Sequence, residues 1–250
     1  MRSHKFGPPA GQARRHGDWL WGWHPVLAAL ENPDRQSPRK IAMTAERMRS
    51  ISARFDLADQ IEVMENTAIS ALLPQGAVHQ GLAADFPLLE PLPLATLGSL
   101  PSGVLVMLDQ ITDPQNVGAI FRSAAALGAR GVVLQDRSAP PLIGALAKAA
   151  AGAVDKLPHA RETNLSRALE RLDEMGWRAV GLEGTASDSL EQVLDTRPTV
   201  LVVGSEGDGL RRLVREHCDT LARIPMAGGF ESLNVAAAAA IALYEASRVR

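Results

Sequence analysis

The sequence predicts an α/β protein built from two parts, and three observations support this. Towards the carboxy terminus, short apolar segments rich in β-branched residues alternate with helical patterns, which is typical of a parallel sheet covered on both faces. A weaker alternation precedes it, and a proline-rich stretch separates the two. We therefore expect a basic tail over 1–17, a small α/β domain over 18–86, a linker over 87–101 and a larger domain over 102–250.

The larger domain carries the stronger pattern. Its expected strands are Val104–Asp109, Gly131–Gln135, Arg178–Gly181, Thr199–Gly204 and Leu221–Pro225. The helices expected between and after them are Val117–Leu127, Leu142–Ala150, Asn164–Met175, Leu210–His217 and Ser232–Arg248. In a doubly wound sheet of this kind, ligands bind at the carboxyl ends of the strands.

The smaller domain has shorter elements. Its expected strands are Lys40–Thr44, Ile61–Glu65 and Ala77–Phe86, and its expected helices are His24–Leu30, Ala45–Phe55 and Ala68–Leu73. In the linker, prolines at 87, 91, 93 and 101 argue against a helix and against a central strand.

Composition excludes several classes of protein. Hydrophobic residues make up 46% and charged residues 22% of the 250 residues, as in ordinary globular proteins. A single cysteine excludes a disulfide framework, and no cysteine and histidine spacing indicates a metal site. No apolar run is long enough to cross a bilayer, and the first residues lack a signal-peptide pattern. We expect a soluble, cytoplasmic protein without a metal.

The first seventeen residues contain Arg2, Lys5, Arg14 and Arg15 and no acidic residue. Such a tail suits contact with a polyanion such as RNA, because each phosphate pairing releases counterions. A solvated terminus without a role explains the same residues equally well.

The first segment suited to chemistry follows the expected strand Val104–Asp109. Asp113 and Asn116 suit a turn and a helix cap, and Gly118 permits close approach of a ligand or of another backbone. Arg122 is then a fixed cation near the end of a strand, which suits recognition of phosphate or carboxylate. The alternative for Arg122 is a side chain extending from a helix edge into solvent.

The second segment, Val202–Leu210, is a buried strand followed by a glycine-rich turn into a helix. Its glycines permit close backbone approach to a ligand. The spacing matches neither the dinucleotide fingerprint nor a Walker loop, so a nicotinamide-dependent oxidoreductase is not indicated. An ordinary turn would not explain Glu206.

The third segment passes from Ile224-Pro225 through a double glycine to Ser232, Asn234 and an alanine-rich helix. One of the two polar residues suits the helix cap. The presence of both suggests that at least one of them points elsewhere.

Together, Asp113-Pro-Gln-Asn-Val-Gly-Ala-Ile-Phe-Arg122, Gly204-Ser-Glu-Gly-Asp-Gly-Leu210 and Ile224-Pro-Met with Ser232-Leu-Asn-Val resemble the three motifs of the SpoU/TrmH class of SPOUT methyltransferases. Upstream, Trp21–Leu30 and Gly76–Gly81 resemble the amino-terminal domain of the subgroup that methylates a 23S rRNA guanosine. The resemblance implies transfer of a methyl group from S-adenosylmethionine to a ribose 2′-hydroxyl of RNA. It also implies a carboxy-terminal trefoil knot and a homodimer formed through the knot region.

The resemblance further assigns roles to residues. The implied cofactor site comprises the backbone of Gly204, Ile224 and Leu233 with Glu206, Gly207, Met226 and Asn234. The implied catalytic residues are Arg122, Asn116, Glu206, Ser232 and Asn234, and the implied RNA contacts are Arg122 and His79. To these the charge of the basic tail adds Arg14 and Arg15 as expected RNA contacts. Because arginine stays protonated, Arg122 suits holding a phosphate and stabilising developing negative charge better than it suits removing a proton.

Two other functions fit the same residues. A tRNA ribose methyltransferase would share the carboxy-terminal half, whereas the segment around His79 favours rRNA. A non-catalytic RNA-binding assembly factor would share the fold, but Asn116, Arg122, Glu206 and Ser232 are all present.

Overall fold

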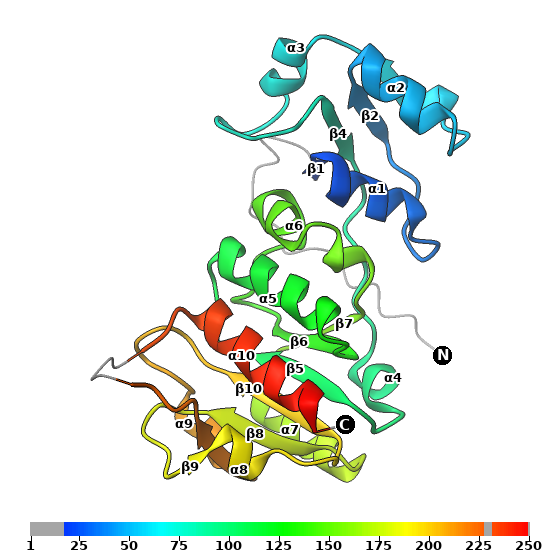
Figure 1. Cartoon of the computed structure of the whole chain (residues 1–250). Helices are drawn as coiled ribbons and strands as arrows, with labels where there is room; N and C mark the ends of the chain where they lie inside the picture. Colours follow the sequence, from blue (N-terminus) through cyan, green and yellow to red (C-terminus); the bar gives the residue numbers. More distant parts are fainter. Residues whose placement is uncertain (1–17, 228–231, 250) are drawn as a thin grey trace.

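The computed structural model describes residues 18–227 and 232–249, and it contains two sheets. The larger sheet has seven strands in the order β7-β6-β5-β10-β8-β11-β9, and every neighbouring pair in it is parallel. This confirms the α/β class and the parallel carboxy-terminal sheet. Figure 1 shows the smaller sheet with its helices stacked at one end of the larger domain.

The elements of the carboxy-terminal domain follow in chain order. The strands are β5 (Val104–Leu108), β6 (Gly131–Gln135), β7 (His159–Glu162), β8 (Arg178–Leu182), β9 (Asp188–Ser189), β10 (Thr199–Val203) and β11 (Thr220–Arg223). The helices are α5 (Pro114–Ala126), α6 (Gly144–Ala150), α7 (Leu165–Glu174), α8 (Leu190–Val193), α9 (Arg212–Glu216) and α10 (Val235–Arg248), with a 3₁₀ turn at Ala153–Asp155.

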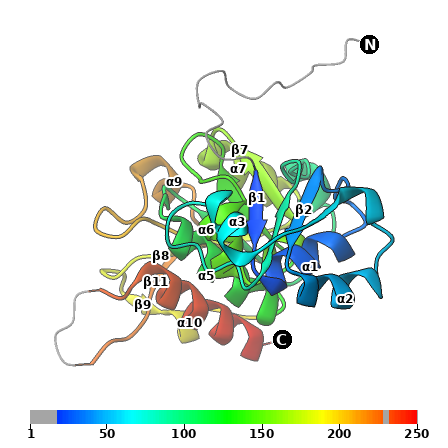
Figure 2. The same ribbon diagram turned by 90° about the horizontal axis from the view of Figure 1, so that it is seen from above.

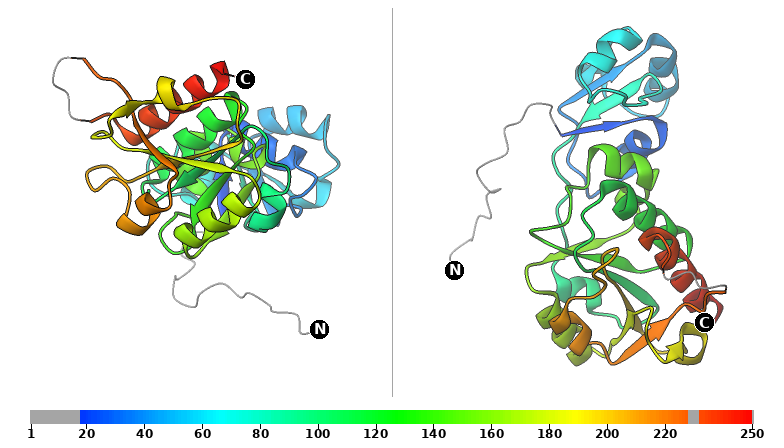
Figure 3. Two further views of the ribbon diagram at one scale, coloured as in Figure 1. Left: turned by 90° about the horizontal axis from the view of Figure 1, so that it is seen from below. Right: turned by 90° about the vertical axis from the view of Figure 1, so that its left-hand side faces the viewer.

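Alternate residues of each central strand face opposite helical layers, as the period of a strand requires. Val104 and Val106 of β5 share a core with α5 and α10, whereas Leu105 and Met107 share one with α7. From above, α10 lies alongside α5 (Figure 2), and from below α7 lies on the far side of the sheet from α10 (Figure 3). Because both faces are buried, the strands read as continuous apolar runs.

The linker contains an element that the sequence reading excluded. A short helix, α4 (Leu94–Gly98), begins directly after Pro93, so the expectation that the prolines forbid a helix was wrong. Proline lacks only the donor that the first turn of a helix leaves unpaired, and the seven residues from 94 to 100 contain no proline. Leu94 and Leu97 are buried in the core beneath α7, and the Gly98 carbonyl accepts a hydrogen bond from Trp177 Nε1 (2.9 Å).

The amino-terminal domain is built on a four-stranded sheet in the order β1-β4-β2-β3. Its strands are β1 (Trp19–Trp21), β2 (Lys40–Met43), β3 (Ile61–Val63) and β4 (Leu82–Asp85), and its helices are α1 (Trp23–Glu31), α2 (Ala45–Ser52) and α3 (Asn66–Ala71), with a 3₁₀ turn at Ala58–Gln60. The strand expected over Ala77–Phe86 is confined to β4, because the chain turns at Gln80 and Gly81, both of which have positive φ. Strand β1 was not anticipated.

Helix α6 joins the two domains. Its Ala147 belongs to the core beneath α1 and α2, and its Ala145 packs against the core on the other face of the small sheet. A buried ion pair adjoins this contact, with Arg35 Nη1 2.6 Å from Asp155 Oδ1 and both side chains at most 2% exposed. These contacts fix the relative placement of the two domains.

His159 begins β7 and is 2% exposed. Burial, reinforced by the charges of Arg161 and Arg35, lowers the pKa of His159 to about 4 from an ordinary 6.5. The unfolded chain therefore protonates His159 at a higher pH than the folded chain does. As a result, the free energy of unfolding falls as the pH drops from 6.5 towards 4.

Between pH 7.5 and pH 5 we expect His159 to account for about 2 kcal/mol of lost stability. Urea titrations of the wild type and of His159→Gln at both pH values measure the difference, and His24→Gln, on an exposed position, is the control. Equal pH dependence in the wild type and His159→Gln would count against this reading.

Among the described helices, none is long and apolar enough to span a bilayer.

Candidate active site

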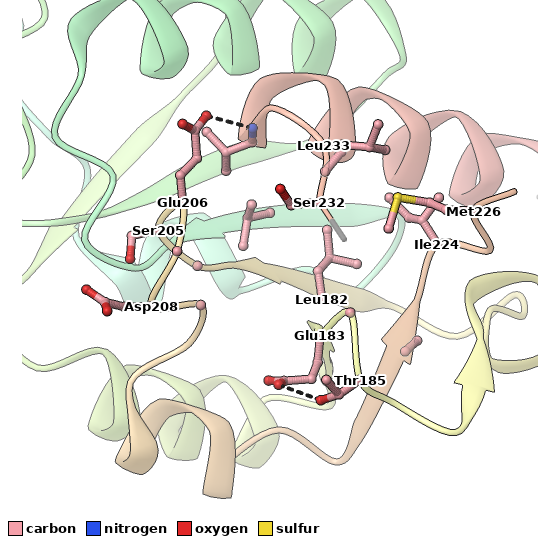
Figure 4. Close-up of a pocket in the computed structure, with 18 residues that line it drawn as sticks. Leu182, Glu183, Thr185, Ser205, Glu206, Asp208, Ile224, Met226, Ser232 and Leu233 are labelled. Atoms are coloured by element: carbon pink, nitrogen blue, oxygen red, sulfur yellow. Dashed lines mark hydrogen bonds between the residues drawn. The ribbon is translucent and has the colours of Figure 1, made fainter. Parts of the chain in front are cut away.

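A cavity of about 320 Å³ opens at the carboxyl ends of β8, β10 and β11, beside the start of α10 (Figure 4). Residues from four segments line it: Leu182–Thr185, Val203–Gly209, Ala222 with Ile224 and Met226, and Ser232 with Leu233, Val235 and Ala238. Parallel strands bring these segments together, because their carboxyl ends meet at one edge of the sheet.

The loop after β10 forms one wall. The backbones of Ser205 and Gly209 exchange two hydrogen bonds of 3.1 Å, which closes the loop on itself. A side chain at Gly204 would clash with the backbone of Gly209 and Leu210, so this close approach requires glycine. Gly207 and Gly209 have φ of 91° and 66°, values that disfavour other residues.

Asp109 anchors the base of this loop. It follows β5, is completely buried, and accepts hydrogen bonds from the backbone N (2.9 Å) and Nε (2.7 Å) of Arg211. A buried carboxylate needs such a partner, because burial without one destabilises the charge. The pair therefore ties the end of the loop to the neighbouring strand.

Glu206, at the tip of the loop, links three segments. Its Oε1 accepts hydrogen bonds from the backbone N of Val235 (3.0 Å), from Asn234 Nδ2 (2.9 Å) and from Asn116 Nδ2 (3.3 Å). Asn234 Nδ2 also donates to Asn116 Oδ1 (3.0 Å). The carboxylate thus lies at the amino-terminal end of the fourteen-residue helix α10, where the helix dipole favours negative charge.

Asn234 serves two purposes at once. Its Oδ1 accepts from the backbone N of Ala236 (3.0 Å) and Ala237 (3.3 Å), which caps α10, while its amide nitrogen donates towards Asn116 and Glu206. Ser232 lines the cavity. The two polar residues of the third segment therefore have different roles, as the sequence suggested.

The opposite wall is apolar and open to solvent. Met226 and Leu233 are 37% and 38% exposed, and Ile224 is partly buried between them and the core. Large apolar side chains that face a cavity next to a polar cluster are typical of a small-molecule site.

The predicted cofactor residues Gly204, Glu206, Gly207, Ile224, Met226 and Leu233 all line the cavity, and Asn234 is bonded to Glu206. The sequence reading missed Leu182–Thr185. A signal was present, since Glu-Gly-Thr follows an expected strand of the same parallel sheet.

Arg122 lies elsewhere on α5. It is exposed and does not line the cavity, and within the described residues its side chain forms no hydrogen bond or ion pair. Asn116 and Arg122 are six residues apart on α5, which separates their Cα atoms by about 9 Å along the helix axis. Gly118, between them, faces the backbone of Leu146 and Ala150 in α6, so its small size serves helix packing.

His79 is buried and uses both ring nitrogens within the amino-terminal domain. Nδ1 accepts from the backbone N of Gly81 (3.1 Å), and Nε2 lies 2.9 Å from Ser70 Oγ. The expected RNA contact through His79 would require breaking one of these bonds. Arg14 and Arg15, the other expected RNA contacts, lie outside the described residues.

Within residues 18–227 and 232–249, no cluster of three or more histidine, cysteine, aspartate or glutamate side chains is arranged to hold a metal ion.

Comparison with known sequences identifies relatives over most of the chain. A tRNA/rRNA methyltransferase of Synechocystis, described as uncharacterised, is 40% identical, and the match covers 96% of this chain and 64% of the relative, so the chain spans less than two thirds of that protein. A 23S rRNA (guanosine-2′-O-)-methyltransferase of Photorhabdus laumondii is 38% identical, over 92% of this chain and 98% of the relative.

Solved structures divide according to how much of the chain they match. The SpoU methyltransferase AviRb of Streptomyces viridochromogenes, in complex with AdoMet, has a TM-score of 0.77 at 26% identity and covers 92% of this chain and 89% of its own. The TrmH/SpoU tRNA-modifying enzyme of A. aeolicus has a TM-score of 0.54 at 28% identity and covers 63% of this chain and 82% of its own.

The model of the SpoU rRNA Methylase family matches residues 103–244. This range contains all the residues that line the cavity, together with Asn116 and Arg122. Together with the relatives, this match shows that the chain belongs to the SpoU rRNA methylase family.

Proposed function

We propose that this chain transfers a methyl group from S-adenosylmethionine to the ribose 2′-hydroxyl of a guanosine in 23S rRNA. The observation that carries the proposal is the cavity at the strand ends, with the cluster of Glu206, Asn116 and Asn234 at its edge, in a member of this family. The Photorhabdus relative, which aligns along nearly its whole length, supports the rRNA guanosine as substrate.

The residues of the cavity fit the cofactor. The volume of about 320 Å³ lies at the lower end of the range for small-molecule sites. Gly204, Ile224 and Leu233 would hold S-adenosylmethionine through their backbone groups, with the side chains of Ile224, Met226 and Leu233 as apolar walls. When bound, the cofactor supplies a methyl group already activated by a sulfonium centre, so no metal is required.

The chain itself would position the ribose and stabilise charge. Arg122 would hold a phosphate next to the target ribose and stabilise the negative charge that develops on the 2′-oxygen. Asn116, Glu206, Ser232 and Asn234 would orient the ribose hydroxyl towards the methyl group. The bond from the ribose oxygen to the methyl carbon forms as the carbon–sulfur bond breaks, and the hydroxyl proton leaves to solvent.

The proposal includes a homodimer formed through a knotted carboxy-terminal region and a cytoplasmic location. Ile241 and Tyr244, which are 38% and 53% exposed on α10, support burial of this helix against a second copy. The catalytic and RNA-binding roles assigned above, those of Arg14 and Arg15 included, are part of the same proposal.

The amino-terminal domain favours rRNA over tRNA. The AviRb complex covers 92% of this chain, whereas the A. aeolicus tRNA-modifying enzyme covers 63%. A domain that the tRNA enzyme does not match is a reason to place the substrate among larger RNAs.

The test is transfer of labelled methyl from S-adenosylmethionine to unmodified 23S rRNA and, in parallel, to unmodified tRNA, followed by nuclease mapping. We expect label in one ribose of 23S rRNA and none in tRNA. Label in tRNA alone would keep the chemistry and replace the substrate. Label in neither RNA, with the cofactor bound, would point to a ribosomal particle as the substrate or to the assembly factor.

A further inference from the structure

Gln80 lies at the junction of the two domains in a conformation that few residues adopt. It is exposed, and its φ of 56° falls in the left-handed region. The bonds of His79 to Ser70 and Gly81 hold the backbone on either side of it. Strained residues held by their surroundings occur mainly at functional sites, so the structure around Gln80 invites a functional explanation.

Two cations from different domains meet on Gln80. Lys148 Nζ, from α6 of the carboxy-terminal domain, donates to Gln80 Oε1 (3.2 Å), and Arg47 Nε, from α2 of the amino-terminal domain, donates to the Gln80 carbonyl (3.0 Å). Figure 1 shows α6 directly next to the amino-terminal domain. Two different oxygen atoms of one glutamine thus accept hydrogen bonds from a lysine of one domain and an arginine of the other.

The orientation of Arg47 is fixed while its terminal amines stay available. The guanidinium lies over the ring of Trp23, 5.1 Å from the ring centroid. Within the described residues, only Nε of this guanidinium has a hydrogen-bond partner. An arginine stacked in this way and free at its terminal amines is suited to binding a phosphate with two hydrogen bonds.

Neither cation is neutralised by the protein. In the described part of the chain, no carboxylate lies within ion-pair distance of Lys148 or Arg47, although Glu46 and Glu65 line the cavity beside Gln80. Lys148 is partly desolvated, and this burial lowers its pKa. A partly desolvated ammonium without an anionic partner is unfavourable, and an anionic ligand would relieve this cost.

We propose that Lys148 and Arg47, held together by Gln80, bind a phosphodiester group of the RNA substrate at the junction of the two domains. This site rests on the proposed function, because RNA is the polyanion that an RNA methyltransferase must hold. It adds two cations next to His79, the RNA contact expected in this segment, whose hydrogen bonds to Ser70 and Gly81 also position Gln80.

The site is also connected to the proposed catalytic arginine. Helix α6, which carries Lys148, packs on α5 at Gly118, and Arg122 lies one turn further along α5. Arg122 and Lys148 therefore lie on neighbouring helices, and Gln80 links Lys148 to Arg47 of the amino-terminal domain. We expect an RNA strand whose target nucleotide reaches Arg122 to extend towards the amino-terminal domain.

The test compares Lys148→Gln, Arg47→Gln and the double variant with Arg167→Gln, which removes one exposed cation from α7 on the other side of the sheet. Filter binding of in vitro transcribed 23S rRNA is measured over a range of salt concentrations, and binding of S-adenosylmethionine is measured by calorimetry. A third readout is the split between KM for RNA and kcat.

We expect each single replacement at the site to weaken RNA binding, and the double variant to bind about tenfold less tightly than the wild type. Since both cations hold one phosphate, the second replacement should add little to the first, and the salt slope of the double variant should fall by about 1. KM for RNA should rise while kcat and cofactor affinity stay unchanged. Arg167→Gln should behave as the wild type.

If the wild type methylates 23S rRNA and the double variant shows the same salt slope as the wild type, the site is overturned and the proposed function stands. If Arg167→Gln loses as much RNA affinity as the variants at the site, the effect comes from net charge alone, and the site is overturned as well. A wild-type chain that neither binds nor methylates 23S rRNA or tRNA would overturn the proposed function and this site with it.

Discussion

Replacing Glu206 with alanine is expected to lower kcat/KM for methyl transfer by about a hundredfold, because displaced positioning groups have effects of this size. One oxygen of Glu206 accepts hydrogen bonds from the backbone of Val235 and from the side chains of Asn234 and Asn116. Without it, the loop after β10, the start of α10 and the start of α5 lose their shared partner. We also expect weaker cofactor binding, since Glu206 lines the cavity.

Two further variants make this prediction specific. Glu206→Gln keeps an oxygen that can accept from Val235 and should lose less activity than Glu206→Ala. Glu174→Ala removes an exposed carboxylate on the other side of the sheet and should leave activity unchanged. Steady-state kinetics with RNA and calorimetry with S-adenosylmethionine measure both effects. Full activity in Glu206→Ala would remove this residue from the proposed site.

Replacing Arg122 with alanine is expected to abolish transfer, by about 10³-fold or more, while changing cofactor affinity less than twofold. The separation of the two effects follows from the structure, because Arg122 is exposed and does not line the cavity. For the same reason, the thermal stability of Arg122→Ala should match that of the wild type.

Arg122→Lys distinguishes charge from geometry. Lysine keeps the positive charge and loses the planar pair of donors, so this variant should recover part of the activity if charge stabilisation dominates and little if paired hydrogen bonds to a phosphate dominate. Single-turnover measurements with saturating cofactor separate the chemical step from binding. Wild-type turnover in Arg122→Ala would contradict the catalytic role.

The sequence was sufficient for those parts of the fold that depend on buried periodicity. The strands β5, β6, β8, β10 and β11 are mostly apolar on successive residues, so they were expected within one or two residues of their observed ends. Strand β7 was not expected, because its His-Ala-Arg-Glu sequence has the polar character of a sheet edge. Strand β1 has only three residues, Trp-Leu-Trp, and short aromatic segments give no clear period.

The candidate site was predicted in its components and not in its connections. Asn116 and Asn234 lie far from Glu206 in the sequence, and only the order of strands in the sheet brings both amides to the Glu206 carboxylate. The segment Leu182–Thr185 was missed because no single residue in it is unusual. The two cations at Gln80 belong to different domains, and no local pattern relates Arg47 to Lys148.

The placement of α4 bears on how such a protein can exchange its parts during evolution. Leu94 and Leu97 fill the core beneath α7, and the backbone N of Leu92 bonds to the carbonyl of His159 in β7 (2.8 Å). The segment that reads as a connector is therefore inherited with the carboxy-terminal domain. A recombination event that cut after Pro101 would leave that domain with an uncovered Trp177, whereas a cut near Pro87 would keep α4 with the core that it covers. The small amino-terminal domain would thus be gained or lost at the amino-terminal side of α4.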